Sequence, residues 1–298
     1  MTTGGPAGGG AAAPVLTDAR YRYDERDVIL YALGCGARDD ELHLLCELVG
    51  GLRVLPTFAT VPMGRAVIDA VERLGVDPRT VLHVAQSLRC RAPLPAEGAE
   101  LSTTVTVDGR DEQDRDVLLR LRTTVCDSRG VPLADGVSTL LCREAGGPGA
   151  ERATSAVPPA VAGSPGWRGE VVTAPTQALL FRLNGDRNPA HVLPDAAARV
   201  GYPRPLLHGL CVYGAAALMV VRHACGGDPG RLTGLDVRFS GAAYPGDTLV
   251  GEGWPLDPQR HGVRVRRAAD GRPVLTHGQA RLAPASPVAG PLDEEIWL

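Results

Sequence analysis

The order of apolar and polar residues predicts one buried helix in each half of the chain. Residues 208–224 are rich in Ala, Leu and Val on nearly every side, and Gly226 and Gly227 follow as an end signal. A helix that is apolar all round has to be buried. In the first half the segment MGRAVIDAVERLG, residues 63–75, takes the same place, with Gly75 as its end.

Strand patterns follow each of these helices. Segments such as LLRLRTTV and VRVRR alternate apolar and polar residues, which is typical of a sheet with one face in water. We expect strands over residues 101–107, 117–126, 136–142, 232–239, 249–254, 262–268 and 278–282. One helix wrapped by an antiparallel sheet, twice over, is an α+β fold.

A weak internal repeat divides the chain in two. YALGCGARDDE, from Tyr31, aligns with FRLNGDRNPAH, from Phe181, at an offset of 150 residues. Between the halves, residues 144–169 are rich in Gly, Pro, Ala and Ser, as in a linker. We expect a disordered tail over residues 1–18, a first half over 19–145, a linker over 146–169 and a second half over 170–298.

Composition excludes several classes of function. The net charge is −3 and there is no lysine, so a nucleic-acid partner is not expected. The seven cysteines lie singly, without metal-like spacing, which indicates reduced thiols and no metal site. No apolar run reaches the ~18 residues of a membrane span, and the amino terminus lacks an export signal. We therefore expect a soluble, cytoplasmic protein.

The sequence motifs of the second half resemble those of a known family. GDRNPAH, GYPRPLLHGLC and VRFSGAAYPGDTL are similar to the signature of the MaoC-like, (R)-specific enoyl-CoA hydratases, known as hydratase 2. YRYDERDVILYALGCGA, VLPTFATV and HVAQSLRCRAPLPAEG in the first half resemble the amino half of that family. The resemblance implies a tandem, or double, hotdog fold, a homodimer and one active site per chain.

By position, the resemblance implies that Asp186 and His191 are the catalytic pair, that Asn188 shapes the pocket, and that Gly209 supplies an oxyanion-hole N–H. The implied reaction is syn addition of water to a trans-2-enoyl-CoA, giving a (3R)-hydroxyacyl-CoA. The implied substrate is an acyl-CoA, with an acyl-carrier protein as the alternative carrier. No cofactor or metal is expected, because CoA arrives with the substrate.

Elementary chemistry is consistent with these roles. Hydration of an unsaturated thioester needs a base near the β-carbon, a proton for the α-carbon and a donor for the enolate-like oxygen. A carboxylate and a neutral imidazole can hold one water, and such acid–base help contributes about 10²–10⁴-fold. An N–H at the start of a buried helix suits a developing oxyanion, and Gly209 lets the thioester approach closely. Which of Asp186 and His191 takes the proton first stays open.

Other polar residues have two interpretations each. We place His208, Arg238 and Leu210 in contact with substrate. His208 is expected to order the loop, with proton transfer as the alternative, and Arg238 meets a CoA phosphate or is a solvated strand charge. The remaining histidines are interpreted as surface or packing residues, namely His43, His83, His223, His261 and His277.

The first half lacks the catalytic set. Gly36, Glu41 and Thr60 stand where the second half has Asp186, His191 and Gly209, so its expected task is to make room for a long or bulky acyl tail. Two segments depart from the family pattern, since HVLP replaces H-x-D-P and HVAQ replaces HGEQ. These changes suggest an unusual acyl group.

Three rival functions stay open. They are a dehydratase for 3-hydroxyacyl groups on a carrier protein, a hotdog thioesterase and a non-catalytic acyl-binding subunit.

Overall fold

One antiparallel sheet runs through the whole molecule. The structure is a computed structural model that describes residues 14–49, 51–113, 116–143 and 163–284. Ten strands pair in the order β1-β3-β4-β5-β2-β7-β10-β9-β8-β6. The strands of the first half are β1 (Val15–Asp24), β2 (Val81–Cys90), β3 (Gly98–Gln113), β4 (Asp116–Cys126) and β5 (Pro132–Arg143). Those of the second half are β6 (Trp167–Val172), β7 (Leu232–Phe239), β8 (Thr248–Asp257), β9 (Arg260–Arg267) and β10 (Pro273–Leu282).

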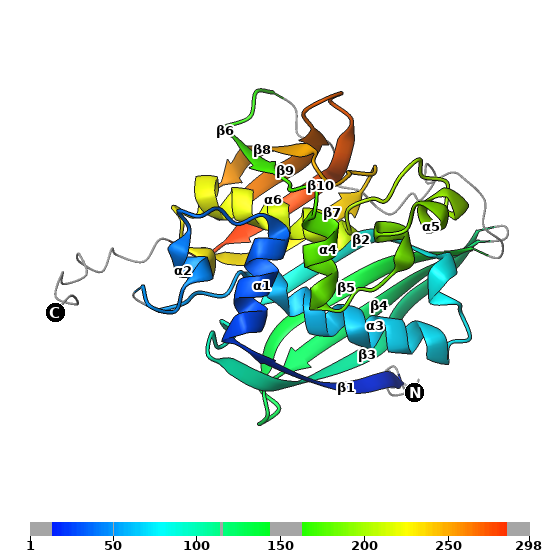
Figure 1. Cartoon of the computed structure of the whole chain (residues 1–298). Coiled ribbons are helices and arrows are strands. Elements are labelled where there is room, and N and C mark those ends of the chain that lie inside the picture. The colour runs from blue at the N-terminus through cyan, green and yellow to red at the C-terminus, as the bar shows by residue number, and fades with distance from the viewer. Residues whose placement is uncertain (1–13, 50, 114–115, 144–162, 285–298) are drawn as a thin grey trace, which may run out of the picture.

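The halves join where β2 pairs with β7. Residues from Ala85 to Arg89 lie antiparallel to residues from Arg238 back to Gly234. The guanidinium of Arg89 donates two hydrogen bonds, of 2.8 and 2.7 Å, to the carboxylate of Asp236 across this junction. The backbone ladder and this ion pair make one sheet of the two halves (Figure 1).

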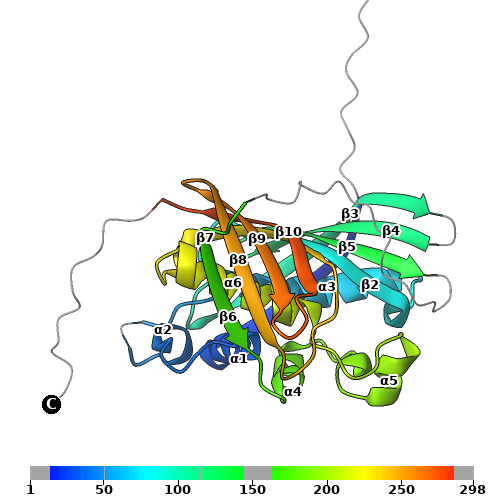
Figure 2. The ribbon, with the colours of Figure 1, turned by 90° about the horizontal axis from the view of Figure 1, so that it is seen from above.

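A long helix packs against each half of the sheet, as Figures 1 and 2 show. Helix α3 (Thr60–Arg73) contacts β1, β3 and β4, and α6 (Gly209–Ala224) contacts the strands of the second half. Every side chain of α6 from Cys211 to Val221 is buried. Helix α1 (Glu25–Cys35) packs on α6 so closely that a Cβ on Gly214 would lie 2.1 Å from Cys35 Sγ.

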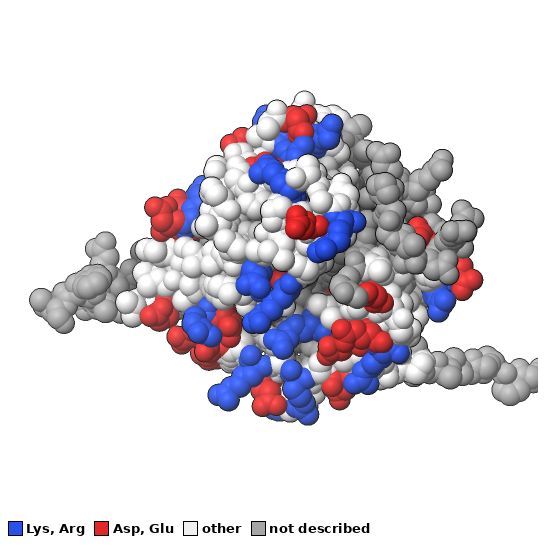
Figure 3. Space-filling view, turned by 45° about the vertical axis from the view of Figure 1, so that its right-hand side comes forward, with Lys and Arg blue, Asp and Glu red and all other residues white. Residues whose placement is uncertain are grey.

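Shorter helices complete the layer. They are α2 (Leu42–Leu45), α4 (Gln177–Phe181) and α5 (Pro194–Arg199), and α4 packs against α1. Among the described residues, no helix is both long and apolar enough to span a membrane. Arginines and acidic residues are interspersed over the face shown in Figure 3, and the mixed charge agrees with the absence of a strongly basic composition.

The expected strands and both long helices are confirmed, but two expected boundaries are wrong. Val15, which falls in the expected tail, starts strand β1, and Thr17 on that strand is buried. Trp167, in the expected linker, starts β6 and pairs with Gly253 of β8. Pairing with a neighbouring strand satisfies the backbone hydrogen bonds of both segments. This pairing outweighs the loop tendency of the Gly- and Ala-rich sequence around them. Residues 1–13 and 144–162 of the expected tail and linker lie outside the described residues.

The loop of the first half that aligns with the catalytic loop holds a buried ion pair. Glu41 accepts hydrogen bonds of 2.6 Å from both Nε and Nη2 of Arg222, at the end of α6. The two side chains are 9% and 8% exposed. The backbone N–H of Arg38 also donates to Glu41, at 2.7 Å. This loop therefore fastens the first half to the central helix of the second.

Candidate active site

The candidate catalytic loop is anchored to the first half through α4. The side-chain amide of Gln177 donates to the carbonyls of Leu33 and Gly34 at the end of α1, at 2.9 and 2.7 Å. The chain then leaves α4 through a short 3₁₀ turn and Gly185, whose φ of 117° lies where only glycine is comfortable. Asp186 follows at once, so its position depends on both halves.

The spacing from Asp186 to His191 is explained by a tight turn around Asn188. The backbone N–H of Asn188 donates to Asp186 Oδ1 at 3.1 Å, and Asn188 Oδ1 accepts from the N–H of Ala190 at 3.0 Å. Asn188 thereby caps a 3₁₀ turn, Pro189–His191, whose proline presets the first φ. The amide of Asn188 fixes the loop, and the turn brings the carboxylate and the imidazole together.

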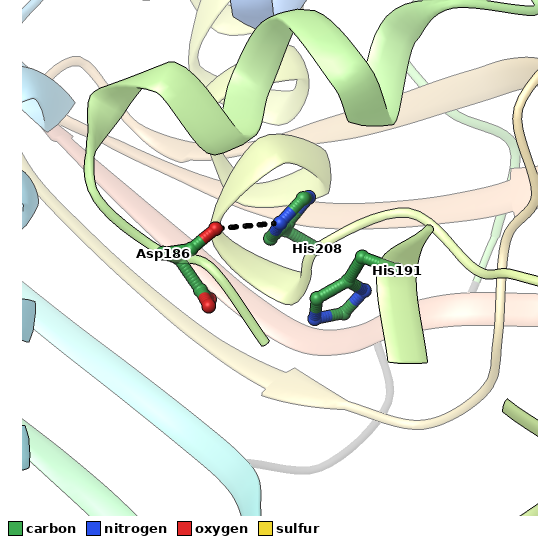
Figure 4. A group of neighbouring side chains, drawn as sticks. All are labelled: Asp186, His191 and His208. Atoms are coloured by element: carbon green, nitrogen blue, oxygen red, sulfur yellow. Dashed lines mark hydrogen bonds between the residues drawn. The ribbon is translucent and has the colours of Figure 1, made fainter. Parts of the chain in front are cut away.

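Two histidine rings stack beside Asp186. The ring centroids of His191 and His208 are 3.8 Å apart, with 29° between the planes. His208 Nε2 donates to the main-chain oxygen of Asp186 at 3.2 Å, the dashed line in Figure 4. In the same view the Asp186 carboxylate and the His191 ring face the same space below His208.

Hydrogen bonding fixes which nitrogen of His191 carries the proton. His191 Nδ1 lies 2.9 Å from the carbonyl oxygen of Leu206. A carbonyl only accepts, so Nδ1 bears the hydrogen and Nε2 keeps a lone pair. By the same reasoning His208 carries its hydrogen on Nε2, and its buried Nδ1 has no partner among the described residues.

Burial keeps both rings neutral. Burial lowers the pKa of His191, although the nearby charge of Asp186 opposes the shift. Burial, followed by the neighbouring His191, lowers the pKa of His208 to about 3. Since His208 is fully buried and ties itself to the Asp186 backbone, the geometry supports the loop-ordering interpretation of this residue.

The amino end of α6 lies beside the two histidine rings, because His208 immediately precedes it. Gly209 is the first residue of this helix, and the side chain of the N-cap His208 makes no capping bond to it. The first N–H groups of a helix have no intrahelical acceptor and carry the positive end of its dipole. A Cβ at Gly209 would lie 3.2 Å from Cε1 of Phe239, so a larger residue would crowd this ring.

A groove leads from Asp186 to the first half. Leu210 lies in it, and α3 forms its other wall. Its lining includes Val61, Arg65, Ile68, Phe181, Asp186 and Leu210. The exposed surface of the groove is mostly apolar, and its polar lining residues are Thr60, Arg65, Asn184 and Asp186.

The predicted site residues do not all come together. Asp186, Asn188, His191, His208 and Gly209 form one site, and Leu210 is in the adjoining groove. Arg238 is instead on β7, opposite Ala85 and Thr276. Because successive residues of a strand face opposite sides, its side chain leaves the sheet on the face away from Phe239.

His83 is a packing residue, as expected, and it lies close to the site. The ring of this first-half histidine lies 4.9 Å from that of Phe239, which borders Gly209. Its segment, HVAQ, had stood out only as a departure from a family pattern. The structure places it next to the site.

The three polar side chains do not suit a metal ion well. Asp186, His191 and His208 each offer a donor atom within 4.8 Å of the others. Two imidazoles that bind one ion must both aim their ring planes at it, and at tetrahedral sites such nitrogens lie about 2.0–2.1 Å from the metal. Rings stacked at 3.8 Å are instead arranged side by side. The arrangement suits hydrogen bonding to a water and a substrate.

Comparisons with known proteins agree with this architecture. The MaoC like domain matches residues 157–272, and the MFE-2 hydratase 2 N-terminal domain matches residues 21–144. The 3-hydroxyacyl-thioester dehydratase Y of Mycobacterium tuberculosis is 34% identical over 281 residues, covering 91% of this chain and 95% of that protein. The peroxisomal enoyl-CoA hydratase 2 of Arabidopsis thaliana is 34% identical over 264 residues, covering 80% and 84%.

A solved structure extends the likeness to three dimensions. A MaoC-like dehydratase from Phytophthora capsici aligns with a TM-score of 0.79 and 26% identity, over 92% of this chain and 97% of that one. Each half of the sheet wraps around its own long helix as one hotdog unit, and the two units together are a double hotdog fold. The chain thus belongs to the MaoC-like dehydratase family, in its hydratase 2 group of hydro-lyases.

Proposed function

We propose that this chain adds water reversibly to trans-2-enoyl thioesters and forms (3R)-hydroxyacyl thioesters. The observation that carries the proposal is the convergence of three groups on one space. They are the Asp186 carboxylate, the unprotonated Nε2 of His191 and the amino end of α6 at Gly209. Each group matches one requirement of the reaction.

In the proposed mechanism, Asp186 and His191 hold one water between them. The water oxygen bonds to the β-carbon, one of its protons passes to the pair, and a proton is returned to the α-carbon on the same face. Leu206 supports the role of His191, because its carbonyl holds the Nδ1 hydrogen and turns Nε2 toward the water. The N–H of Gly209 binds the thioester oxygen, where negative charge grows in the enolate-like transition state.

The groove along α3 is proposed to take the acyl chain. Its apolar walls, which include Val61, Ile68 and Leu210, suit a hydrocarbon, and Asp186 in its lining would lie beside the reacting carbons. This assigns the first half the task of binding the acyl tail. A homodimer and a cytoplasmic location stay predictions of the sequence.

A dehydratase that works on a carrier-bound 3-hydroxyacyl group is the second candidate. The relative from Mycobacterium tuberculosis is described as acting on a 3-hydroxyacyl thioester and that from Arabidopsis thaliana on an enoyl-CoA. Both substrates share the thioester chemistry of the proposed site. Turnover of matched CoA-bound and carrier-bound thioesters separates the two candidates.

The test follows the loss of enoyl absorbance with crotonyl-CoA and longer enoyl-CoAs. Asp186→Asn and His191→Ala are expected to lower kcat/KM by about 10²–10⁴-fold, the usual contribution of acid–base catalysis. Asp195→Asn is the matched control, because this carboxylate is exposed on α5 nearby. Mutants at 186 and 191 as active as the wild type would refute the site assignment.

A folded wild type that hydrates no enoyl thioester would refute the proposed function itself. Release of free thiol from a saturated acyl-CoA would then favour a thioesterase, and binding without turnover would favour an acyl-binding subunit.

A further inference from the structure

The groove along α3 contains one charged side chain that is not paired within the described part of the chain. Three of its four polar lining residues have partners. Thr60 and Asn184 donate to main-chain carbonyls at 2.7 and 3.0 Å, and Asp186 accepts from a main-chain N–H at 3.1 Å. The fourth is Arg65, whose guanidinium has neither a hydrogen-bond acceptor nor a carboxylate partner among the described residues.

Contacts with both halves fix the place of the Arg65 side chain. Its Cδ and Cγ lie 3.6 and 3.7 Å from the point where a Cβ on Gly185 would be, so the stem lies against the backbone just before Asp186. The guanidinium carbon is 5.6 Å from the centre of the Tyr21 ring on β1, within the range of a cation–π contact. The positive charge is therefore held at the groove, close to the catalytic loop.

The nearest carboxylates are engaged elsewhere. Asp24 and Asp27 lie near Tyr21, but each accepts a hydrogen bond from the backbone N–H of the other in the capping box of α1. Asp69 follows Arg65 by one turn of α3, and the guanidinium lies over Tyr21 without an ion pair to it. The charge of Arg65 is thus open to an anion from outside the chain.

The part of the substrate that reaches Arg65 is the acyl chain. Ile68, in the same groove, is three residues further along α3, which is about 4.5 Å of helix. A plain hydrocarbon laid over the guanidinium would displace water and offer no hydrogen bond in return, which is unfavourable. A carboxylate would instead match the planar guanidinium with two parallel N–H···O bonds.

We infer that the acyl group of the natural substrate ends in a carboxylate, and that Arg65 binds this carboxylate. The inference rests on the proposed function, because it takes the groove as the acyl site. The substrate class is then the monothioester of an unsaturated dicarboxylic acid. The positive charge of Arg65 also offsets the repulsion between such a tail and Asp186.

The test compares two substrates that differ only at the far end of a six-carbon chain. They are the CoA monothioester of trans-2-hexenedioic acid and trans-2-hexenoyl-CoA, and the readout is the ratio of their kcat/KM values. Arg65→Met removes the charge and keeps an unbranched stem, and Arg65→Glu reverses the charge. Arg73→Met is the matched control, because Arg73 is exposed on the same helix about 12 Å further on and outside the groove.

The wild type should favour the dicarboxylic substrate by about 10–100-fold, the usual effect of a hydrogen-bonded charge. The ratio should fall to about one in Arg65→Met and below one in Arg65→Glu, and Arg73→Met should keep the wild-type ratio. A wild-type ratio of one or less would overturn the inference. So would an Arg65→Met variant that loses the same factor on both substrates, since Arg65 would then meet a phosphate of CoA, which both substrates share.

A binding measurement keeps the inference separate from catalysis. The saturated CoA monothioester of hexanedioic acid and hexanoyl-CoA, neither of which can be hydrated, are titrated into wild type and Arg65→Met by calorimetry. The wild type should bind the dicarboxylic thioester at least about tenfold more tightly, and Arg65→Met should bind both alike. Equal Kd values in the wild type would refute the carboxylate contact even in an active hydratase. A wild type that hydrates neither enoyl thioester would refute the proposed function, and the titration would still decide the contact.

Discussion

Replacing Arg222 by methionine should destabilise the protein far more than the loss of an ordinary surface charge. Arg222 and Glu41 are 8% and 9% exposed and share two hydrogen bonds of 2.6 Å. Removing one partner leaves the other charge buried and unpaired, which typically costs about 3–5 kcal/mol. That is a large share of the roughly 5–15 kcal/mol by which folded domains are stable.

Urea unfolding at pH 7 measures this cost, and a double variant checks its origin. Glu41→Met should be about as destabilising as Arg222→Met. The double variant should recover most of the loss, because two apolar side chains leave no buried charge. A loss below about 1 kcal/mol for Arg222→Met would refute the reasoning. So would a double variant whose loss equals the sum of the two single losses.

The pH dependence of the same variants gives an independent check. Burial raises the pKa of Glu41, but the hydrogen bonds and charge of Arg222 outweigh it, and the pKa is lowered below its ordinary 4.5. The stabilisation is therefore complete above pH 4.5 and is lost as the pH falls through the depressed pKa. In Arg222→Met the pKa of Glu41 is no longer lowered by the arginine. The difference in the free energy of unfolding between the wild type and this variant should therefore shrink as the pH falls below 4.5.

Four further predictions concern the site and the core. Since burial lowers the pKa of His191, kcat/KM should stay constant down to its ordinary 6.5 and decline only at lower pH, and a kcat/KM that already falls between pH 8 and pH 6.5 would contradict this. Because the pKa of His208 falls to about 3 through burial and then His191, the unfolded chain takes up its proton first. The free energy of unfolding should therefore fall by up to about 1.4 kcal/mol per unit from pH 6.5 toward 3, and His208→Gln should flatten that slope. Gly214→Ala should cost about 1–3 kcal/mol in urea unfolding, because its Cβ would meet Cys35 Sγ at 2.1 Å, and adding Cys35→Ala should recover part of it. Ile68→Trp, in the groove wall, should lower kcat/KM for decenoyl-CoA and spare crotonyl-CoA, which equal losses on both substrates would refute.

The regular elements could be predicted from sequence because their patterns are local. Alternation marked the strands, and the apolar run of α6 marked a buried helix. The start of α1 is also marked locally, since Asp24 and Asp27 form a capping box there. Strand β1 was not among the expected strands. Its first residues fell in the expected tail because they adjoin a Gly- and Ala-rich stretch, whereas their strand conformation depends on pairing with β3.

The candidate site was predictable only in part. Asp186, Asn188 and His191 lie on one short turn, so their spacing in sequence already brings them together. The position of His83 could not be read in the same way. It depends on a bulge at Val84, and that bulge exists only in the register between β2 and β5.

The strand order of the sheet has a consequence for how this protein can change. From the β2–β7 junction outward, the order in one half repeats that in the other, so the two halves are placed like the subunits of a symmetric pair. In a pair of identical chains, any substitution appears at both equivalent positions. Here the two positions are encoded separately, and each can be altered without the other. The loop with Glu41 holds an ion pair to Arg222, whereas its counterpart carries His191, the imidazole of the proposed catalytic pair. Because both halves are encoded in one polypeptide, the two equivalent loops can keep different residues and different tasks.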